Sequence, residues 1–306
     1  MSELRRDYAL DRWVIIVEKR NLRPHQFKKP EQDKNATDYF APGNEHLTPP
    51  EIGRVENKGS WLVRWFNNKF PAVSTENKFH LKKGLFVSTP AYGHHEVIVE
   101  TPGGKQLWNL TPKEIHQVLK VYQLRVQTLQ KQAHVSFVSI FKNHGKSGGT
   151  SILHSHSQII TTPFTPPYIK QKASAYTPKK IDSILKEEKN SKRTIKETKN
   201  FLAWAPYASR YNFESWIYPK RQVKSMTELT DEEVMELSII LKGILKNMQQ
   251  VCDSYNILTY SSPNGVNMRF HIEILPRVAT WAGFELSSGI IINAVSPETA
   301  ASWLKK

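Results

Sequence analysis

The chain has 306 residues, a formal net charge of +15 and one cysteine. This length suffices for one large or two ordinary domains with a sizeable core. A single cysteine, Cys252, excludes a disulfide framework and a cysteine-based zinc cluster. The sequence contains no apolar run of about 18 residues that could span a membrane. Its charged start also lacks the apolar segment of a secretory signal. We therefore expect a cytoplasmic protein without a membrane partner.

The positive charge could bind a polyanionic partner such as a nucleic acid. It could equally belong to a lysine-rich solvated surface and a site for phosphorylated substrates. Part of the excess lies in residues 165–200, which contain ten Lys or Arg and four Asp or Glu. This segment has few aromatic residues on which bases could stack. We therefore favour the second explanation over a nucleic-acid partner.

Residues 23–60 are rich in Pro, Asn, Lys and Glu and are expected to be mostly loop. A strand is predicted at residues 95–102, and a long helix follows it to about residue 132. Thr111 and Glu114 form a capping box at the start of this helix, and Pro112 occupies its first position. Its predicted buried face consists of Val118, Val121, Tyr122, Leu124, Val126 and Leu129.

Two strands are predicted next, at residues 135–142 and 151–161. On the second strand, alternation places His154, His156 and Gln158 on one face. The loop before them is dense in Gly and Ser, so its N–H groups can approach a phosphate and Ser151 can donate to it. A neutral histidine is a competent nucleophile toward phosphorus. The spacing of the histidines would also suit half of a metal site, but the glycine loop and Gln158 favour catalysis.

The region 163–200 contains four prolines and a predicted helix at residues 181–189, and we expect a surface arm. A second unit then repeats the first. It has a strand at residues 214–219, a helix capped by Thr230 and Glu233, and strands at residues 257–261 and 266–275. Its last strand reads Arg269-Phe270-His271-Ile272-Glu273 and does not repeat the two-histidine pattern. A final helix begins at Ser296.

These elements predict an α+β fold made of two tandem repeats, each an antiparallel sheet with one long helix packed on it. The first repeat with its N-terminal extension covers residues 1–164, and a basic inter-repeat arm covers 165–200. The second, degenerate repeat covers residues 201–306. We expect the first repeat to carry the chemistry and the second to support structure or substrate.

Residues 143–158 follow the pattern Asn-x-Gly-Lys-x-x-Gly-x-Ser-x-x-His-x-His-x-Gln. This pattern resembles the active-site segment of galactose-1-phosphate uridylyltransferases, the nucleotide-transferring branch of the histidine-triad superfamily. Other segments resemble the family in the same order, and they cover nearly the whole chain: 20–24, 42–45, 68–71, 95–102, 219–221, 271–277 and 282–285. The resemblance implies that both repeats are histidine-triad-like.

By this resemblance, His156 is the nucleophile that attacks the α-phosphorus of a nucleoside-diphosphate sugar and carries the nucleotide. A sugar 1-phosphate or another phosphate acceptor then takes the nucleotide, so one displacement between anions becomes two steps. His154, Gln158 and Ser151 complete the implied catalytic set. The leading expectation is a UDP-glucose:hexose-1-phosphate uridylyltransferase. Two alternatives are an ADP-sugar phosphorylase or adenylyltransferase, and a non-catalytic nucleotide- or RNA-binding relative.

The resemblance also implies substrate contacts. Basic residues near the phosphates are Arg20 and Arg23. Positions matching the nucleoside pocket are Tyr39, Phe40, Asn68 and Phe70. Asn143 would bind phosphates or cap the loop, and Glu285 would bind sugar hydroxyls. A family lysine is missing from residues 278–281, which weakens the case for galactose 1-phosphate as acceptor. Family members are usually dimers, which implies a homodimer here.

Zinc-containing members carry Cys-x-x-Cys where this chain has Asp38-Tyr39-Phe40-Ala41. A third ligand, a histidine, is replaced within residues 103–105, so only His154 remains. One histidine and one aspartate do not make a tetrahedral N/S zinc site, and we expect no metal and no cofactor. His94, His95 and His144 could form a different set. However, adjacent strand residues such as His94 and His95 point to opposite faces.

Overall fold

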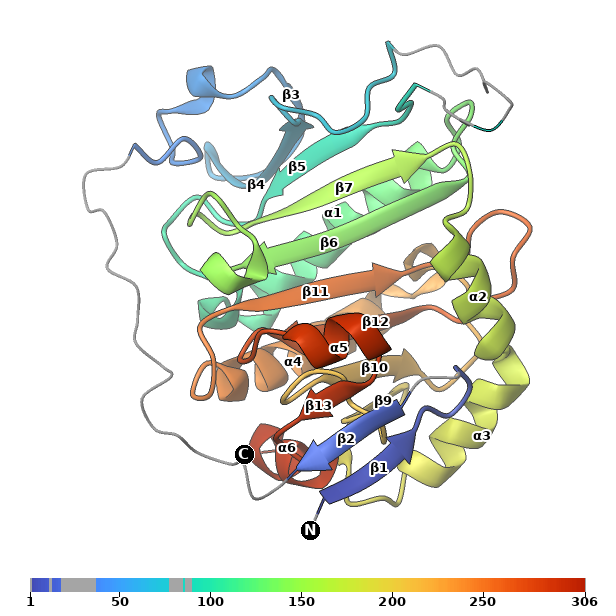
Figure 1. The fold of residues 1–306 in the computed structure, drawn as a ribbon. Coiled ribbons are helices and arrows are strands. Elements are labelled where there is room, and N and C mark those ends of the chain that lie inside the picture. Colours follow the sequence, from blue (N-terminus) through green and yellow to red (C-terminus); the bar gives the residue numbers. More distant parts are fainter. Residues whose placement is uncertain (1, 11–12, 18–36, 77–84, 86–89, 306) are drawn as a thin grey trace.

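A computed structural model describes residues 2–10, 13–17, 37–76, 85 and 90–305 (Figure 1). The predicted phosphate-binding residues Arg20 and Arg23 lie outside the described residues. A ten-stranded antiparallel sheet forms the centre of the molecule, in the order β3-β4-β5-β7-β6-β11-β12-β10-β9-β8. The sheet consists of two halves of five strands each, with the same strand arrangement, which meet where β6 pairs with β11.

Both halves contain a hairpin, a third strand, a long helix and a second hairpin. The first half consists of β3 (Glu51–Asn57), β4 (Ser60–Asn67), β5 (His95–Val99), α1 (Pro112–Leu129), β6 (Phe137–His144) and β7 (His156–Thr162). The second consists of β8 (Thr194–Glu197), β9 (Phe201–Trp204), β10 (Ser215–Pro219), α4 (Asp231–Met248), β11 (Tyr255–Tyr260) and β12 (His271–Pro276). The expected α+β fold of two tandem repeats is confirmed. Both repeats share one sheet, and the proposed division at residues 164 and 200 stays a prediction.

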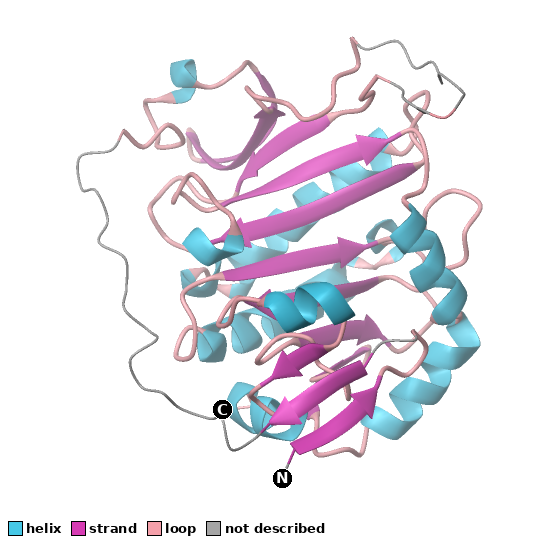
Figure 2. Cartoon of the chain, in the orientation of Figure 1, coloured by secondary structure: helices cyan, strands magenta, loops and turns pink. Residues whose placement is uncertain are grey.

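Helices α1 and α4 cover one face of the sheet and pack against each other (Figures 1 and 2). Both begin with the predicted capping boxes, at Thr111 and at Thr230. The main core lies between these helices and the sheet. Each fully buried Leu, Ile or Val side chain there contributes about 1.5–3 kcal/mol to stability.

The prediction that Leu124 lies on the buried face of α1 is wrong, because this side chain is 45% exposed. Its neighbour Gln123 lies on the buried side instead. The Gln123 amide donates to the carbonyls of Met226 and Leu229 in the second repeat, at 2.7 and 3.0 Å. Gln123 is buried because its amide forms hydrogen bonds across the interface between the repeats. The apolar pattern of the sequence does not predict such a contact.

Residues 165–200 form α2 (Pro167–Ala175), α3 (Pro178–Glu188) and the strand β8. The two helices line the side of the second repeat (Figure 1). Tyr176, Ile181 and Ile184 are buried in a second apolar cluster with Trp204 and Trp216. The predicted arm is thus packed against the second repeat along much of its length.

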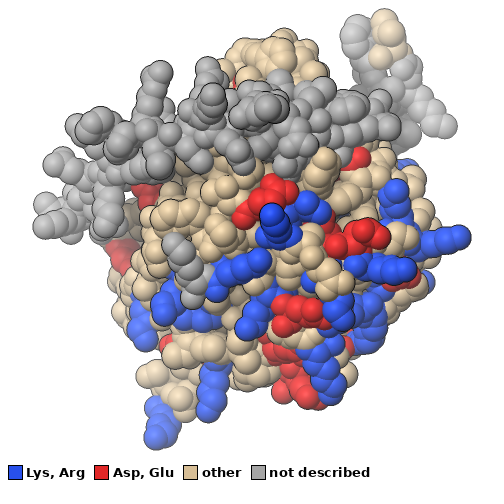
Figure 3. Space-filling model, turned by 90° about the horizontal axis from the view of Figure 1, so that it is seen from below, with Lys and Arg blue, Asp and Glu red and all other residues tan. Residues whose placement is uncertain are grey.

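Basic side chains lie among acidic ones on the face of the molecule shown in Figure 3. The 165–200 segment contributes several ion pairs. Lys189 lies 3.2 Å from Glu197, and Arg193 lies 3.0 Å from both Glu188 and Glu298. The Lys189–Glu197 pair lies on the surface, whereas Arg193 pairs with the completely buried Glu188, so part of this basic charge is neutralised within the fold.

A smaller sheet of β1 (Ser2–Arg6), β2 (Trp13–Val17) and β13 (Ile291–Asn293) lies beside the second repeat. The short helix α5 (Gly283–Ser288) precedes β13, and α6 (Pro297–Leu304) ends the chain with the predicted Ser296 cap. Within the described residues, no helix has the length and apolar character needed to cross a membrane.

Candidate active site

His156 is the first residue of β7, so the predicted strand at residues 151–161 begins later than expected. Its Nδ1 lies 2.8 Å from the carbonyl oxygen of His154. Because a carbonyl only accepts, Nδ1 carries the proton and Nε2 keeps its lone pair. Burial lowers the pKa of His156, the bond to His154 opposes this shift, and the Lys142 ammonium adds to it. The site therefore holds a neutral imidazole with an unprotonated Nε2.

His154 is fully engaged by protein oxygens. Its Nδ1 lies 2.8 Å from Asp38 Oδ2, and its Nε2 lies 2.6 Å from the Thr101 carbonyl oxygen. The Phe40 ring lies nearly perpendicular to both imidazole rings, with centroids 6.1 Å from His154 and 5.3 Å from His156. His154 therefore ties the segment around Asp38 and Phe40 to the first repeat.

The residues at the family's zinc position do not fit a zinc ion. Both nitrogens of His154 are already hydrogen-bonded, and Asp38 is its direct partner rather than a second ligand. In the part of the chain that the structure describes, no three His, Cys, Asp or Glu residues form a metal-binding group.

His144 and His95, both candidate ligands of a different metal site, lie in different surroundings. His144 packs against Trp108 and Tyr255, with ring centroids 4.4 and 4.8 Å away. Burial lowers its pKa to about 4. His95 is hydrogen-bonded to Gln158 instead. His144 is therefore a partly buried residue packed against two aromatic rings, and His95 belongs to the candidate active site.

Gln158 lies on the same strand as His156, two residues further along. Its Oε1 is 2.8 Å from His95 Nε2 and 3.5 Å from Asn68 Nδ2. The Asn68 oxygen accepts from the Phe70 N–H at 2.8 Å. The structure therefore brings Asn68 together with the histidine strand, whereas the Phe70 side chain is 83% exposed.

The loop between β6 and β7 is held tightly against β11. Gly145 has a φ of 72°, and a Cβ atom there would lie 2.2 Å from Ser254 Oγ. Gly149 has a φ of 85° and ends the short 3-10 helix η4 (Lys146–Gly148). Such positive φ values favour glycine. Ser151 is exposed at the end of this loop, before the histidines.

Asn143, on β6 before this loop, pairs across the junction between the repeats. Its Oδ1 accepts from Asn256 Nδ2 at 2.8 Å. Asn256 Nδ2 also donates to the Gly148 carbonyl at 2.8 Å. The amide of Asn143 thus joins the second repeat to the glycine loop.

A buried charge network lies on the opposite side of the histidine strand. Lys142 Nζ donates to Glu100 Oε2 at 2.6 Å, to Ser155 Oγ at 3.0 Å and to the His156 carbonyl at 3.1 Å. Tyr122 of α1 and Ser157 also donate to Glu100. Burial alone would raise the pKa of Glu100, but Lys142 and the hydroxyl donors hold it below its usual value.

The structure also describes the two remaining predicted residues, Tyr39 and Glu285. Tyr39 is half exposed on the segment after Asp38. Glu285 lies on α5, where its Oε2 accepts from the Ala282 N–H at 3.0 Å and caps the helix. Their predicted roles in binding nucleoside and sugar remain predictions.

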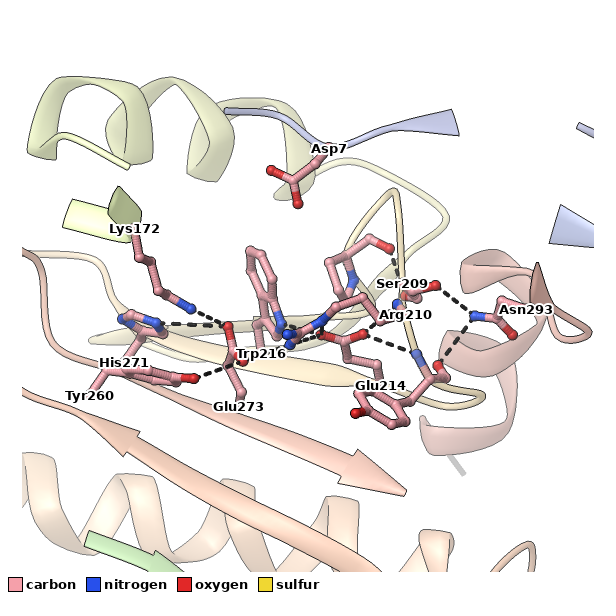
Figure 4. Close-up of polar contacts among 12 residues, drawn as sticks. Asp7, Lys172, Ser209, Arg210, Glu214, Trp216, Tyr260, His271, Glu273 and Asn293 are labelled. Atoms are coloured by element: carbon pink, nitrogen blue, oxygen red, sulfur yellow. Dashed lines mark hydrogen bonds and ion pairs between the residues drawn. The ribbon is translucent and has the colours of Figure 1, made fainter. Parts of the chain in front are cut away.

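The second repeat contains a closed counterpart of this site (Figure 4). His271 Nδ1 lies 2.9 Å from the Arg269 carbonyl oxygen, the same two-residue geometry as His156 and His154. The His271 ring stacks between Tyr218 and Tyr260, with centroids 4.4 and 4.6 Å away. Burial, aided by Lys172, lowers its pKa to about 3.

The position equivalent to Gln158 is Glu273, which is completely buried. Its carboxylate pairs with Lys172 of α2 and with Arg210, the latter at 2.8 Å (Figure 4). Protein side chains therefore occupy the surroundings of His271. That the first repeat carries the chemistry stays a prediction.

Sequence reasoning missed three members of the site: His95, Asn256 and Lys142. Each is a polar side chain at a buried strand position, where apolar residues are more common. That contrast was the available signal, but the partner of each residue depends on strand register.

The sequence model described as galactose-1-phosphate uridyl transferase, N-terminal domain, matches residues 1–166. A model described as a domain of unknown function (DUF4921) matches residues 93–304. An ADP-glucose phosphorylase of Arabidopsis thaliana is 31% identical, over 99% of this chain and 92% of its own length. A galactose-1-phosphate uridylyltransferase of Thermotoga maritima is 28% identical, over 100% of this chain and 98% of its own.

Two solved structures share the complete fold. A crystal structure of an ADP-glucose phosphorylase from Arabidopsis thaliana with bound ADP-glucose has a TM-score of 0.84 and 28% identity, covering 100% of this chain and 99% of that one. A uridylyltransferase structure has a TM-score of 0.76 and 26% identity, covering 100% and 97%. With a family model matching more than half of its length, this chain belongs to the galactose-1-phosphate uridyl transferase family of nucleotidyltransferases.

Proposed function

We propose that this chain transfers a nucleotide from a nucleoside-diphosphate hexose to a phosphate acceptor through a covalent nucleotidyl-His156 intermediate. The observation that carries the proposal is the bond from His156 Nδ1 to the His154 carbonyl, because this tautomer makes Nε2 the nucleophile. The bond from Nε2 to the α-phosphorus forms while the bond from phosphorus to the sugar-phosphate oxygen breaks. A sugar 1-phosphate leaves, and an acceptor phosphate oxygen later displaces His156.

The groups around His156 support this chemistry. Gln158 and Asn143 offer amide N–H donors, and the loop before the histidines offers backbone N–H groups and Ser151. Such donors stabilise the negative charge that develops on phosphoryl oxygens in the transition state. Arg20 and Arg23 are proposed to contribute positive charge on the basis of the family resemblance alone.

For the nucleobase, we propose adenine first. The support is the full-length similarity to an ADP-glucose phosphorylase, both in sequence and in fold. The missing family lysine before Gly283 also argues for an acceptor other than galactose 1-phosphate, and inorganic phosphate suits a phosphorylase. A uridylyltransferase is the second candidate, supported by relatives of similar identity. A homodimer, as the resemblance implies, is part of both proposals.

Intact-mass measurement tests the proposed function directly. The purified protein is incubated separately with ADP-glucose and UDP-glucose, without an acceptor. We expect a mass gain of one AMP with ADP-glucose, reversed by inorganic phosphate with release of ADP. A gain of one UMP from UDP-glucose alone would favour the uridylyltransferase, and no gain from either substrate would refute the covalent mechanism.

The lowered pKa of His156 gives a pH-dependent expectation. Protonation of Nε2 removes the nucleophile, so the rate of the first step falls as the pH decreases through this pKa. We expect kcat/KM for this step to fall with a midpoint below 6.5, the ordinary value for histidine. Stopped-flow or quench measurements of nucleotidylation between about pH 4.5 and 8, which bracket the ordinary histidine pKa, provide the test. A midpoint at or above 6.5 would contradict the neutral buried nucleophile.

We also propose that the protein binds no stoichiometric zinc, since His154 and Asp38 bond to each other. Elemental analysis of the purified protein should show no zinc that tracks with protein concentration. Incubation with excess zinc followed by gel filtration should leave none bound. About one zinc per chain, lost in a His154→Ala variant, would contradict this proposal.

A further inference from the structure

Two amide side chains at the candidate site, Gln158 and Asn143, have their oxygen atoms bonded to donors within the protein. We infer that His95 and Asn256 are positioning residues that hold these amides with their NH2 groups free for a bound phosphate. The inference deepens the proposed function and rests on it, since it states how that site presents donors to an anion.

The His95 ring has a defined polarity. The Ala72 N–H donates to its Nδ1 at 3.0 Å, so Nδ1 is an acceptor and Nε2 carries the proton of the neutral ring. Nε2 lies 2.8 Å from Gln158 Oε1 and donates to it. Asn68 Nδ2 also lies 3.1 Å from Nε2, but a protonated Nε2 cannot accept, so the acceptor for Asn68 is Gln158 Oε1 at 3.5 Å. His95 faces Ile160 across the β5–β7 pair, which makes Gln158 its diagonal neighbour.

This polarity sets the orientation of the glutamine. If the Gln158 amide turned over, its NH2 group would face the N–H of His95, and neither group could accept. Within the described chain, no group accepts a hydrogen bond from the NH2 of Gln158 in the observed orientation. That NH2 group is therefore the part of Gln158 available to a ligand.

Asn256 acts on Asn143 in the same way, from the second repeat. The Gly148 carbonyl accepts from Asn256 Nδ2 at 2.8 Å, and Arg277 Nη1 donates to Asn256 Oδ1 at 3.1 Å. A carbonyl cannot donate and a guanidinium cannot accept, so the orientation of Asn256 is determined. Its Nδ2 donates to Asn143 Oδ1 at 2.8 Å, and among the residues that the structure describes no group accepts from the Asn143 NH2, which is therefore available to a ligand.

Both arrangements point to the same ligand chemistry. Phosphoryl oxygens are acceptors, so an amide helps only when its NH2 side faces them. A turned amide would bring its carbonyl oxygen against a negative charge. Buried donors on the oxygen side hold both amides in the productive orientation before the substrate arrives.

The proposed role of His95 is tested with substitutions that separate the effect of its Nε2 N–H donor from the effect of its ring volume. A glutamine places its amide nitrogen near the position of Nε2, whereas phenylalanine keeps the ring and removes the donor. For His95→Phe we expect about tenfold slower nucleotidylation by ADP-glucose and about tenfold weaker binding of ADP. His95→Gln should restore most of both. His94→Phe, the preceding histidine on the other face, serves as the matched control.

A double-mutant cycle distinguishes positioning from a structural role. In a Gln158→Ala background, His95→Phe should cause no further loss, because its effect acts through Gln158. Similarly, Asn256→Asp should slow nucleotidylation about tenfold, and Asn143→Ala should abolish that effect. Losses that multiply in the double variants, or no loss in the single ones, would overturn the inference.

The two readouts also separate this inference from the proposed function. If the wild type binds ADP or UDP but acquires no nucleotide, the covalent mechanism fails and the positioning roles are judged on affinity alone. If the wild type becomes nucleotidylated while His95→Phe and Asn256→Asp react at the wild-type rate, the positioning roles fail alone. A wild type that binds neither nucleotide would overturn both.

Discussion

Replacing His156 with alanine is expected to lower nucleotide transfer by roughly 10⁴-fold or more, because the covalent route loses its nucleophile. The remaining donors can still hold the phosphates but offer no atom to attack phosphorus. The purified variant should show no mass gain with ADP-glucose or UDP-glucose. Its affinity for ADP should stay within about a few-fold of the wild type, since most binding groups remain.

Two companion variants make this prediction specific. His156→Gly leaves space for an imidazole, and added imidazole should restore part of the transfer. His271→Phe changes the equivalent histidine of the second repeat, which stacks between Tyr218 and Tyr260. This control should still acquire one nucleotide per chain. An alanine variant with near-normal turnover, or label retained on another residue, would refute His156 as the nucleophile.

The sequence predicted the elements whose signals are local. The capping boxes at Thr111 and Thr230 and the apolar stripe of α1 lie within single segments, and the structure confirms them except at Leu124. The repeated order of strand, helix and hairpin predicted two similar units. The tight loop before the histidines was also evident, because Gly145 and Gly149 adopt conformations that favour glycine.

The contacts that complete the site depend on long-range register. His95 and Gln158 are 63 residues apart, and Asn143 and Asn256 are 113 apart. Which side chains meet follows from the pairing of β5 with β7 and of β6 with β11. A shift of one residue in either pair would send these side chains to the other face. A single sequence without structural information does not determine that register, so these partners could not be predicted.

Replacing Lys142 with methionine is expected to destabilise the fold by about 3–5 kcal/mol at neutral pH, as for one partner of a buried ion pair. Lys142 and Glu100 are both almost completely buried, with side-chain exposures of 2% and 0%. Methionine fills similar space but leaves the Glu100 carboxylate without its cation. Urea unfolding should show a much lower midpoint than the wild type. An unchanged midpoint would mean that the ion pair contributes nothing measurable.

The pH dependence of this loss identifies Glu100 as its cause. In the wild type the pKa of Glu100 is lowered, so its contribution to stability is present above the unfolded-state pKa of about 4.3 and is lost as the pH falls through the folded value. Without Lys142, burial should raise this pKa above the unfolded value. The variant then gains stability relative to the wild type as the pH falls from 7 toward about 4, because a protonated carboxyl carries no charge. The difference in unfolding free energy should therefore shrink in acid.

A double variant, Lys142→Met with Glu100→Gln, removes both charges and keeps a hydrogen-bonding group for Tyr122, Ser155 and Ser157. It should recover at least about half of the stability lost in the single variant, and its deficit should no longer vary with pH in this range. Because Lys142 also donates to the His156 carbonyl at 3.1 Å, nucleotidylation by the double variant reports whether the ion pair serves the catalytic strand as well as the fold. A double variant less stable than Lys142→Met alone would show that the loss comes from packing around residue 142 and not from an unpaired buried charge.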